Sequence, residues 1–432
     1  MSDINHAYVL TEMADERPAP VATSGPILWL RTNLFSSVTN AGLTIFALYL
    51  VYLVLPPLIN FAFVTAVWSG VDREACVGPE VGACWAYVGA YFDQFVYGRY
   101  PVDERWRVDL VYLIGALALI PALMPTVPYK KLNVIFLALV YPVMTFILLS
   151  GGDLAFEDYL VGYATFSAIV LALGVGVAWL TEANYKPIVF SLASILAGVA
   201  AVCMIMSTPF GLEPVETPLW GGMLVSLVIA ISGIAASLPI GVAFALGRRS
   251  KMPIVRLVCI GFIEFWRGVP LITVLFMSSV VLPLFLPEGV SLDKLLRALI
   301  AVGLFSAAYM AEVIRGGLQA IPKGQYEGAQ ALGLNFWQMM GLIVLPQALK
   351  LVIPGIVNTF IGLFKDTTLV LIIGLFDLLG MIQSSFTDPT WSTPVTSHTG
   401  YLFAAAVYWV CCFGMSRYSI FMEERLHRGH KR

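Results

Sequence analysis

Ten long apolar segments constrain the fold of this chain more than any other feature of its sequence. A helix needs about 20 apolar residues to cross the hydrocarbon core of a bilayer, and a helix satisfies its own backbone hydrogen bonds there. We therefore predict an all-α polytopic membrane protein with about ten transmembrane helices. The segments centre on residues 43–64, 109–126, 132–150, 160–180, 187–206, 221–246, 256–286, 294–316, 350–374 and 400–421.

The composition agrees with a protein that is surrounded largely by lipid. Of its 432 residues, 59% are hydrophobic and 12% are charged, whereas soluble chains are roughly 45–50% apolar and about 25% charged. The net charge of -2 and the lack of a basic tract predict no nucleic-acid partner. The N-terminal stretch MSDINHAYVLTEMADERPAP lacks the pattern of a cleavable signal peptide, so we expect the first span to act as the insertion signal.

The basic residues of the short loops predict the orientation, because cytoplasmic loops carry an excess of Lys and Arg. The stretches PYKK, GRRSKMPIVR and RLHRGHKR fall on one side, together with the loop between Arg315 and Lys350. The opposite loops GGDLAFED and TPFGLEPVETP hold no Lys or Arg, although the longer loop after the first span carries four arginines. An even number of spans then places both termini in the cytoplasm.

Charged residues enter the apolar segments mainly in the second half of the chain, and the segments of the first half hold almost none. Ionisable groups inside membrane segments are costly and mark functional or interfacial positions. Glu264 and Arg267 are three residues apart, as are Glu312 and Arg315. We expect both sets to clamp the cytoplasmic ends of their spans, with substrate contact as the alternative.

Lys365 and Asp366 lie deep in the apolar run GIVNTFIGLFKDTTLVLIIG. Adjacent helix positions point about 100° apart, so these two side chains cannot pair face to face. One interpretation is a broken or path-lining segment, to which Asn358 and Thr367 add polar atoms. The other is an ion pair with a second membrane subunit, and both stay open at this level.

The stretch QYEGAQALGLNFWQMMGLIVLP is too polar for a span and too apolar for a solvent loop. Its pattern predicts one short helix between Pro322 and Gly333. A second helix would be capped by Asn335 and stopped by Pro346.

Phe336, Met339, Met340 and Ile343 recur at helical spacing and predict an apolar stripe on the second helix. Such a stripe at the membrane surface favours the docking of a soluble partner. The alternative is an amphipathic hairpin that lies on the bilayer or covers the chain's own spans.

The same stretch resembles the EAA signature, E-A-A-x3-G-x9-I-x-L-P, of the membrane subunits of ATP-binding-cassette importers. The matching residues are Glu327, Ala329, Gly333, Ile343, Leu345 and Pro346, and Gly328 stands where the signature has Ala. The resemblance implies that these residues couple the chain to a separate ATPase. Glu327 would be a polar anchor and Gly333 the turn.

Further stretches, such as IEFWRGVPLITVLF and YMAEVIRGGLQAIPKGQ, resemble permease subunits of polar amino-acid importers. The likeness is greatest to the general L-amino-acid type and its relative for glutamate, glutamine, aspartate and asparagine. It implies that the five C-terminal spans form a type I importer permease core. The expected divisions are a cytoplasmic segment at 1–40, an N-terminal transmembrane extension at 41–210 with a periplasmic loop at about 66–108, and the core at 211–425 with its EAA loop at 318–349.

The resemblance also implies partners and a location. It predicts a sibling permease chain, a dimeric ATP-binding subunit that holds ATP and magnesium, a periplasmic amino-acid-binding protein, and the bacterial inner membrane. The chain has no phosphate-loop motif, so we expect no cofactor, catalytic residue or ATPase site of its own. A secondary transporter or channel is the alternative, for which charges in both halves would be expected.

Six cysteines and four histidines complete the candidate residues. Cys76 and Cys84 flank a polar loop, where a disulfide and two free thiols are equally open, and the other cysteines lie in apolar runs as packing residues. The aromatic-rich stretch after Cys84 predicts an interfacial belt, with contact to a binding protein as the alternative. No metal-ligand spacing is present among the histidines, which are His6, His398, His427 and His430.

Overall fold

The computed structural model describes residues 25–427 apart from 125, 153, 155, 157–159, 181–184, 209 and 287–291. These residues form helices joined by short loops, and no β-strand occurs among them beyond isolated bridges. Eight of the described helical segments are long and apolar enough to cross a membrane. They are formed by α2 (Val38–Ile59), α4 (Arg105–Leu123), α5 and α6 (Lys130–Ile135 and Tyr141–Ser150), α8 (Tyr185–Met206), α9 (Gly222–Arg248), α12 (Lys294–Ala320), α16 (Ile353–Asp366) and α18 (Thr396–His427).

The segment expected as one span over 256–286 consists of two helices with a sharp bend between them. It consists of α10 (Pro253–Gly268) and α11 (Leu271–Phe276), and the chain bends by 103° between them. Pro270 explains the break, because proline lacks a backbone N–H and disfavours helical geometry at the residue before it. Val269 is accordingly extended, with φ -109° and ψ 134°.

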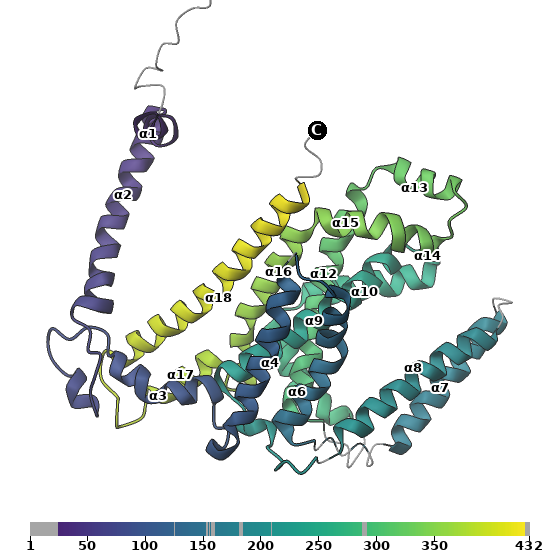
Figure 1. Ribbon diagram of the computed structural model, residues 1–432, viewed down its shortest axis with the longest axis horizontal. Coiled ribbons are helices and arrows are strands. Elements are labelled where there is room, and N and C mark those ends of the chain that lie inside the picture. Colours follow the sequence, from purple (N-terminus) through teal and green to yellow (C-terminus); the bar gives the residue numbers. More distant parts are fainter. Residues whose placement is uncertain are drawn as a thin grey trace, which may run out of the picture.

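This broken pair nevertheless carries the chain from one end of the bundle to the other. The start of α12 lies near the start of α9, because Thr217 donates a 2.5 Å hydrogen bond to the Asp293 carboxylate. The chain must therefore return from the end of α9 to the start of α12. With α7 (Leu160–Leu180), which forms an antiparallel hairpin with α8 (Figure 1), each of the ten apolar segments corresponds to a helical segment.

The main core joins the two halves of the chain. Val108 of α4 and Leu149 of α6 are buried in the same cluster as Leu224 of α9 and Val302 of α12. The division expected near residue 210 therefore does not coincide with a gap in the packing. By contrast, α2 contributes no buried residue and stands apart from the bundle in Figure 1.

The loop after α2 folds into a small lobe, here called the α3 lobe (residues 66–108). It contains α3 (Trp85–Tyr97) and a disulfide between Cys76 and Cys84, whose Cα atoms are 5.8 Å apart. Tyr87 and Phe95 are fully buried against α17 (Leu378–Ser385), so the prediction of an interfacial belt is wrong for these two rings. They form a packed core instead.

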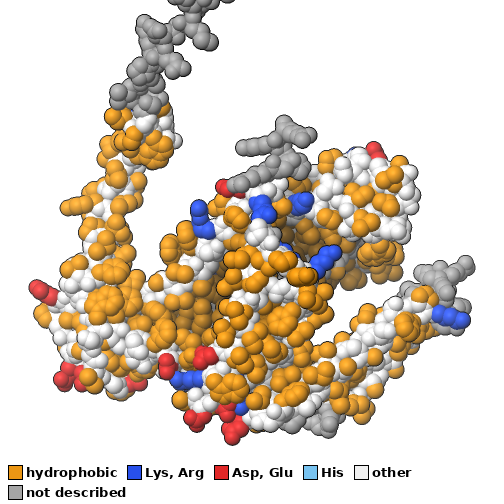
Figure 2. Space-filling model, in the orientation of Figure 1, with side chains coloured by type: hydrophobic (Ala, Val, Ile, Leu, Met, Phe, Trp, Pro, Cys, Tyr) orange, Lys and Arg blue, Asp and Glu red, His pale blue; other side chains and the backbone are white. Residues whose placement is uncertain are grey.

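The two ends of the molecule differ in the elements and charges they carry. In Figure 1, α1 (Pro26–Asn33) and the last turn of α18 lie at the same end as α13 (Lys323–Ala331), while the α3 lobe and α17 lie at the opposite end. On the face seen in Figure 2, most acidic side chains gather at the α3 lobe end and most Lys and Arg toward the other.

Candidate functional site

The stretch with the mixed pattern folds as a pair of short helices, α13 and α14 (Phe336–Met339), joined by a tight turn. Gly333 forms the turn with φ +73°, a conformation that residues with a side chain adopt at a cost. Asn335 caps α14: its side chain accepts a 2.9 Å bond from the Gln338 N–H, and the Gln338 side chain accepts one from the Asn335 N–H. The predicted cap and turn are confirmed.

Pro346 does not stop the second helix, which corrects the sequence-based prediction. After α14 the backbone makes a π-helical turn over Met340–Val344 and continues directly into α15 (Leu345–Leu351). Pro346 lies in the first turn of α15, where its missing N–H and fixed φ are tolerated. The Gln347 side chain also donates a 2.8 Å bond to the Ile343 carbonyl, which stabilises this register.

The inner face of the helix pair packs on the chain's own spans. Met339 and Met340 are buried in a cluster with Ala329 and with Ile314 of α12, and Ile343 packs against this cluster. The expected apolar stripe is therefore divided, because these methionines cover the spans while Phe336 is exposed. The buried part of the stripe covers the chain's own spans, as the alternative interpretation of the sequence expected.

The outer face is apolar and open. Leu332 is 77% exposed, Trp337 73% and Leu342 71%. Glu327 and Gly328 are also exposed on α13. Leu332 and Trp337 were not identified in the sequence analysis. The signal was available, because the turn at Gly333 and the cap at Asn335 fix where the two helices end and begin, and these bounds place both residues opposite the buried positions.

Tyr326 anchors α13 to the ends of two spans. The guanidinium of Arg249, just beyond α9, donates to the Tyr326 hydroxyl at 2.8 Å and to the Leu318 carbonyl of α12 at 3.0 Å. The Tyr326 hydroxyl in turn donates to the same carbonyl at 2.9 Å. A force applied to α13 would therefore reach α9 and α12 through these bonds.

A network of ion pairs joins α9, α10 and α12 beside this anchor. Glu312 binds Arg315 through both carboxylate oxygens, accepts a 2.7 Å bond from Arg248 and lies 3.7 Å from Arg267. Glu264 bonds to Arg248 at 3.0 Å rather than to Arg267, so the local pair expected from the spacing of Glu264 and Arg267 is absent. Arg248, which sequence reasoning did not single out, connects both acids.

The polar residues of α16 occupy different environments. Asn358 and Lys365, seven residues apart, are exposed on one face, and Asp366 is half-buried. Neither charge has an ion-pair partner among the described residues. Thr367 begins a 3-10 helix, is 1% exposed and donates to the Phe364 carbonyl at 2.8 Å, so its hydroxyl lines no open surface in this conformation.

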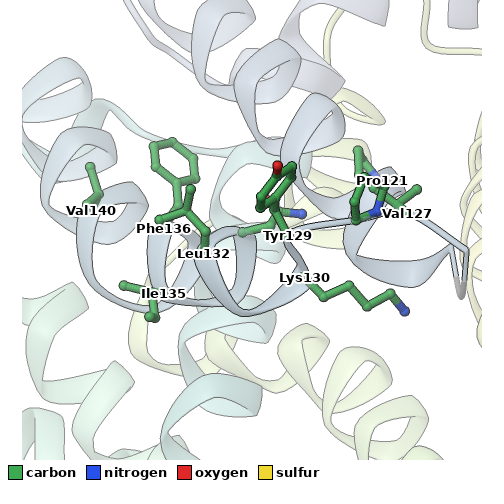
Figure 3. A pocket seen from close by; sticks show the side chains of 10 residues that line it. Pro121, Val127, Tyr129, Lys130, Leu132, Ile135, Phe136 and Val140 are labelled. Atoms are coloured by element: carbon green, nitrogen blue, oxygen red, sulfur yellow. The ribbon is translucent and has the colours of Figure 1, made fainter.

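An apolar cavity near α5 does not suit a polar substrate. It has a volume of about 540 Å³ and lies between the end of α4 and α5. Figure 3 shows Tyr129, Leu132 and Phe136 along its wall, while the Lys130 side chain extends away from them. Within the described residues, no group of three or more His, Cys, Asp or Glu could hold a metal ion. His6 and His430, and the side chain of His427, lie outside the described residues.

Multiple membrane-spanning helices, with an anchored helix pair that exposes an apolar face at one end, are the arrangement expected of a membrane subunit that docks a soluble partner. Residues 237–427 match the family described as "Binding-protein-dependent transport system inner membrane component". The chain is 46% identical over 413 residues to the inner membrane amino-acid ABC transporter permease protein YhdY of Escherichia coli K12, and the match covers 96% of each chain. This chain belongs to the permeases of amino-acid ABC transporters.

A further full-length relative agrees with this assignment. The glutamate/glutamine/aspartate/asparagine transport system permease protein BztC of Rhodobacter capsulatus is 43% identical over 446 residues, and the match covers all of both chains. The crystal structure of an amino acid ABC transporter with histidines has a chain that is 29% identical, with a TM-score of 0.42, covering 47% of this chain and 92% of that one. As a bacterial ABC importer permease, the protein resides in the inner membrane and works with separate ATP-binding and substrate-binding subunits.

Proposed function

We propose that this permease subunit imports polar L-amino acids of the glutamate, glutamine, aspartate and asparagine class. The support is the full-length similarity to BztC, which extends through the N-terminal extension as well as the C-terminal core. Similarity to YhdY over nearly the whole chain agrees with an amino-acid substrate.

The outer face of α13 and α14 is the docking surface for the ATPase. The observation that carries this proposal is the exposed set of Leu332, Trp337 and Leu342 on a helix pair whose inner face is buried. Exposed apolar surface of this kind marks protein interaction sites, and tryptophan is enriched among interface residues that dominate affinity. Glu327 adds a polar contact beside it.

The other residues of the EAA signature hold this surface in place. Ala329 is small and lies on the buried face of α13, and Gly333 makes the turn. Ile343, Leu345 and Pro346 form the continuous helical return toward α16. Gly328 leaves the outer side of α13 smooth.

ATP and magnesium bind to the partner ATPase, and this chain performs no catalysis. Movement of the ATPase reaches the spans through the Tyr326 anchor and the Arg248–Glu312 network. The end that carries α13 and both described chain ends faces the cytoplasm, and the α3 lobe faces the periplasm and the binding protein. The concentration of basic side chains at the α13 end supports this orientation.

A sibling permease covers the exposed polar face of α16. Lys365 and Asn358 on a membrane-spanning helix would be costly against lipid, so they face either the sibling or the translocation path between the two chains. Asp366, at the change from α to 3-10 helix, lies at the same level.

Co-purification tests the docking surface. Trp337→Glu and Glu327→Lys, made in the tagged chain expressed with its partner subunits, should each abolish ATPase retention and amino-acid uptake. Val71→Glu is the matched control, because Val71 is 92% exposed in the α3 lobe at the opposite end. If all three variants retain the ATPase equally, the proposed surface is wrong. Uptake that survives ATP depletion and collapses with the ion gradient would favour a secondary transporter.

A further inference from the structure

A polar cavity of about 320 Å³ lies where α9 ends, between the start of α10 and the last turns of α12. Arginines dominate its wall, and no acid contributes to it. The lining residues are Arg248, Arg249, Ser250, Arg256, Ile260, Arg315 and Gln319.

The nearby carboxylates do not neutralise these arginines. Glu264 and Glu312 bond to Arg248, Arg315 and Arg267, so two negative charges face three positive ones.

The two remaining arginines of the wall add further positive charge. Arg249 donates only to neutral oxygen atoms, those of Tyr326 and Leu318. The side chain of Arg256 is exposed, and its guanidinium makes no hydrogen bond or ion pair within the part of the chain that the structure describes. The cavity therefore carries an excess of positive charge and at least one free guanidinium.

We propose that this cavity binds a phosphate group. Guanidinium groups bind phosphate in a bidentate manner through their planar fork, and these charge-assisted bonds are stronger than neutral ones. Several arginines around one small cavity suit an anion with three or four oxygen atoms better than a carboxylate with two. The Gln319 amide and the Ser250 hydroxyl supply additional donors.

The surroundings favour an anionic phospholipid as the source of that phosphate. In the first turns of α10, which also carry Arg256, three large apolar side chains are exposed: Ile254, Leu257 and Val258. A headgroup in the cavity would leave its acyl chains to pass around α10 to this apolar surface. Basic pockets between membrane helices at the cytoplasmic side bind lipid headgroups in the same manner. A free phosphate ion is the other source of the same chemistry.

Native mass spectrometry of the chain, purified with its co-purifying subunits and delipidated, tests the site with phosphatidylglycerol and phosphatidylcholine. Phosphatidylglycerol should bind more tightly, because phosphatidylcholine has a compensating positive charge. Arg256→Gln should weaken phosphatidylglycerol binding roughly tenfold, the usual effect of losing hydrogen bonds to a charged group. The affinity of Arg256→Lys for phosphatidylglycerol should lie between those of the unaltered chain and Arg256→Gln, because lysine keeps the positive charge but lacks the planar guanidinium.

Lys251→Gln is the matched control, because it removes one positive charge from the same loop at a residue that does not line the cavity. Its affinity for phosphatidylglycerol should equal that of the unaltered chain. Competition with inorganic phosphate separates the sources: displacement of the lipid at millimolar concentration supports a free anion, and failure to displace it supports a headgroup.

The site is disproved if phosphatidylglycerol binds no tighter than phosphatidylcholine, or if Arg256→Gln and Lys251→Gln have equal effects. Equal thermal unfolding of the variants checks that folding is unchanged. Binding is measured without transport, so its outcome does not depend on the proposed substrate or on ATPase docking.

Discussion

Gly328 and Gly333 differ in backbone conformation but not in surroundings. A Cβ atom added at either position would meet nothing within 4 Å, yet only Gly333 has a positive φ, +73°. Gly328→Ala should therefore stabilise α13 by up to about 1 kcal/mol, because Ala is the better helix former. Gly333→Ala should destabilise the turn by roughly 1–2 kcal/mol, the cost of left-handed geometry.

Hydrogen exchange of the α13 amides measures both effects directly. Gly324→Ala, at another position of α13 with open space for a Cβ, should slow exchange as Gly328→Ala does, which shows that the opposite effect at Gly333 does not come from the added methyl group. Equal exchange rates in the Gly328 and Gly333 variants would contradict the assignment of Gly333 as the turn. Gly328→Ala should retain the ATPase.

Asp388 ties the α3 lobe to the loop after α17 and makes this contact sensitive to acid. The Tyr91 hydroxyl donates to its carboxylate, as does the Thr390 N–H at 2.9 Å, and both hold the pKa of Asp388 below its ordinary value. The stabilisation is complete above the ordinary carboxyl pKa of about 3.9. It is lost as the pH falls through the lower, folded-state pKa.

Tyr91→Phe removes this hydrogen bond and should raise the pKa of Asp388, so that the carboxyl takes up its proton at a higher pH in an acid titration followed by tryptophan fluorescence. Tyr87→Phe is the control, because its hydroxyl bonds to the neutral Ser385 hydroxyl and its loss adds no pH dependence in this range. An unchanged midpoint in Tyr91→Phe would show that the hydroxyl does not hold the carboxylate.

Residues whose roles depend on local geometry could be predicted from the sequence, and those that depend on distant contacts could not. Asn335 and Gly333 act within a few residues of themselves, so cap and turn patterns identify them. Arg248 joins Glu264 and Glu312, which are 16 and 64 residues away, and no spacing indicates such a meeting.

The α3 lobe is an element whose stability depends on its disulfide. Cys76 and Cys84 are eight residues apart in sequence. Closing so short a loop lowers the entropy of the unfolded state and stabilises the folded state by about 2–3 kcal/mol. Cys76→Ser should therefore loosen the lobe and speed trypsin cleavage at Arg73 and Arg99. Cys203→Ser removes a free thiol from α8 and should leave cleavage unchanged. Equal rates in both variants would show that the bond does not stabilise the lobe.

Two prolines show the limit of prediction at the scale of an element. Pro270 breaks the helix at Val269, whereas Pro346 lies inside a continuous helical path. The difference arises from the π-helical turn over Met340–Val344, whose buried residues pack on α12. Such a turn depends on tertiary contacts. The sequence therefore shows where a proline could interrupt a helix, but not whether the helix breaks or continues there.

At the scale of the whole molecule, the number of crossings determines where the chain ends lie. The broken pair α10 and α11 decides the parity: if it crosses, ten crossings place α1 and the end of α18 on one side, as in Figure 1. If it did not cross, α9 and α12 could not run in the same direction, which the contact between Thr217 and Asp293 requires.

Labelling of single cysteines with an impermeant maleimide, in chains whose free cysteines are replaced, tests this topology. Val71→Cys in the α3 lobe should react in intact spheroplasts. Gly25→Cys and Gln330→Cys should react only after lysis, because α1 and α13 lie at the other end. Labelling of Gly25→Cys from outside, with Gln330→Cys protected, would mean an odd number of crossings between these positions and would contradict the arrangement. If neither Gly25→Cys nor Gln330→Cys reacts even after lysis, a partner subunit covers both positions. Removal of the ATPase should then allow Gln330→Cys, but not Gly25→Cys, to react.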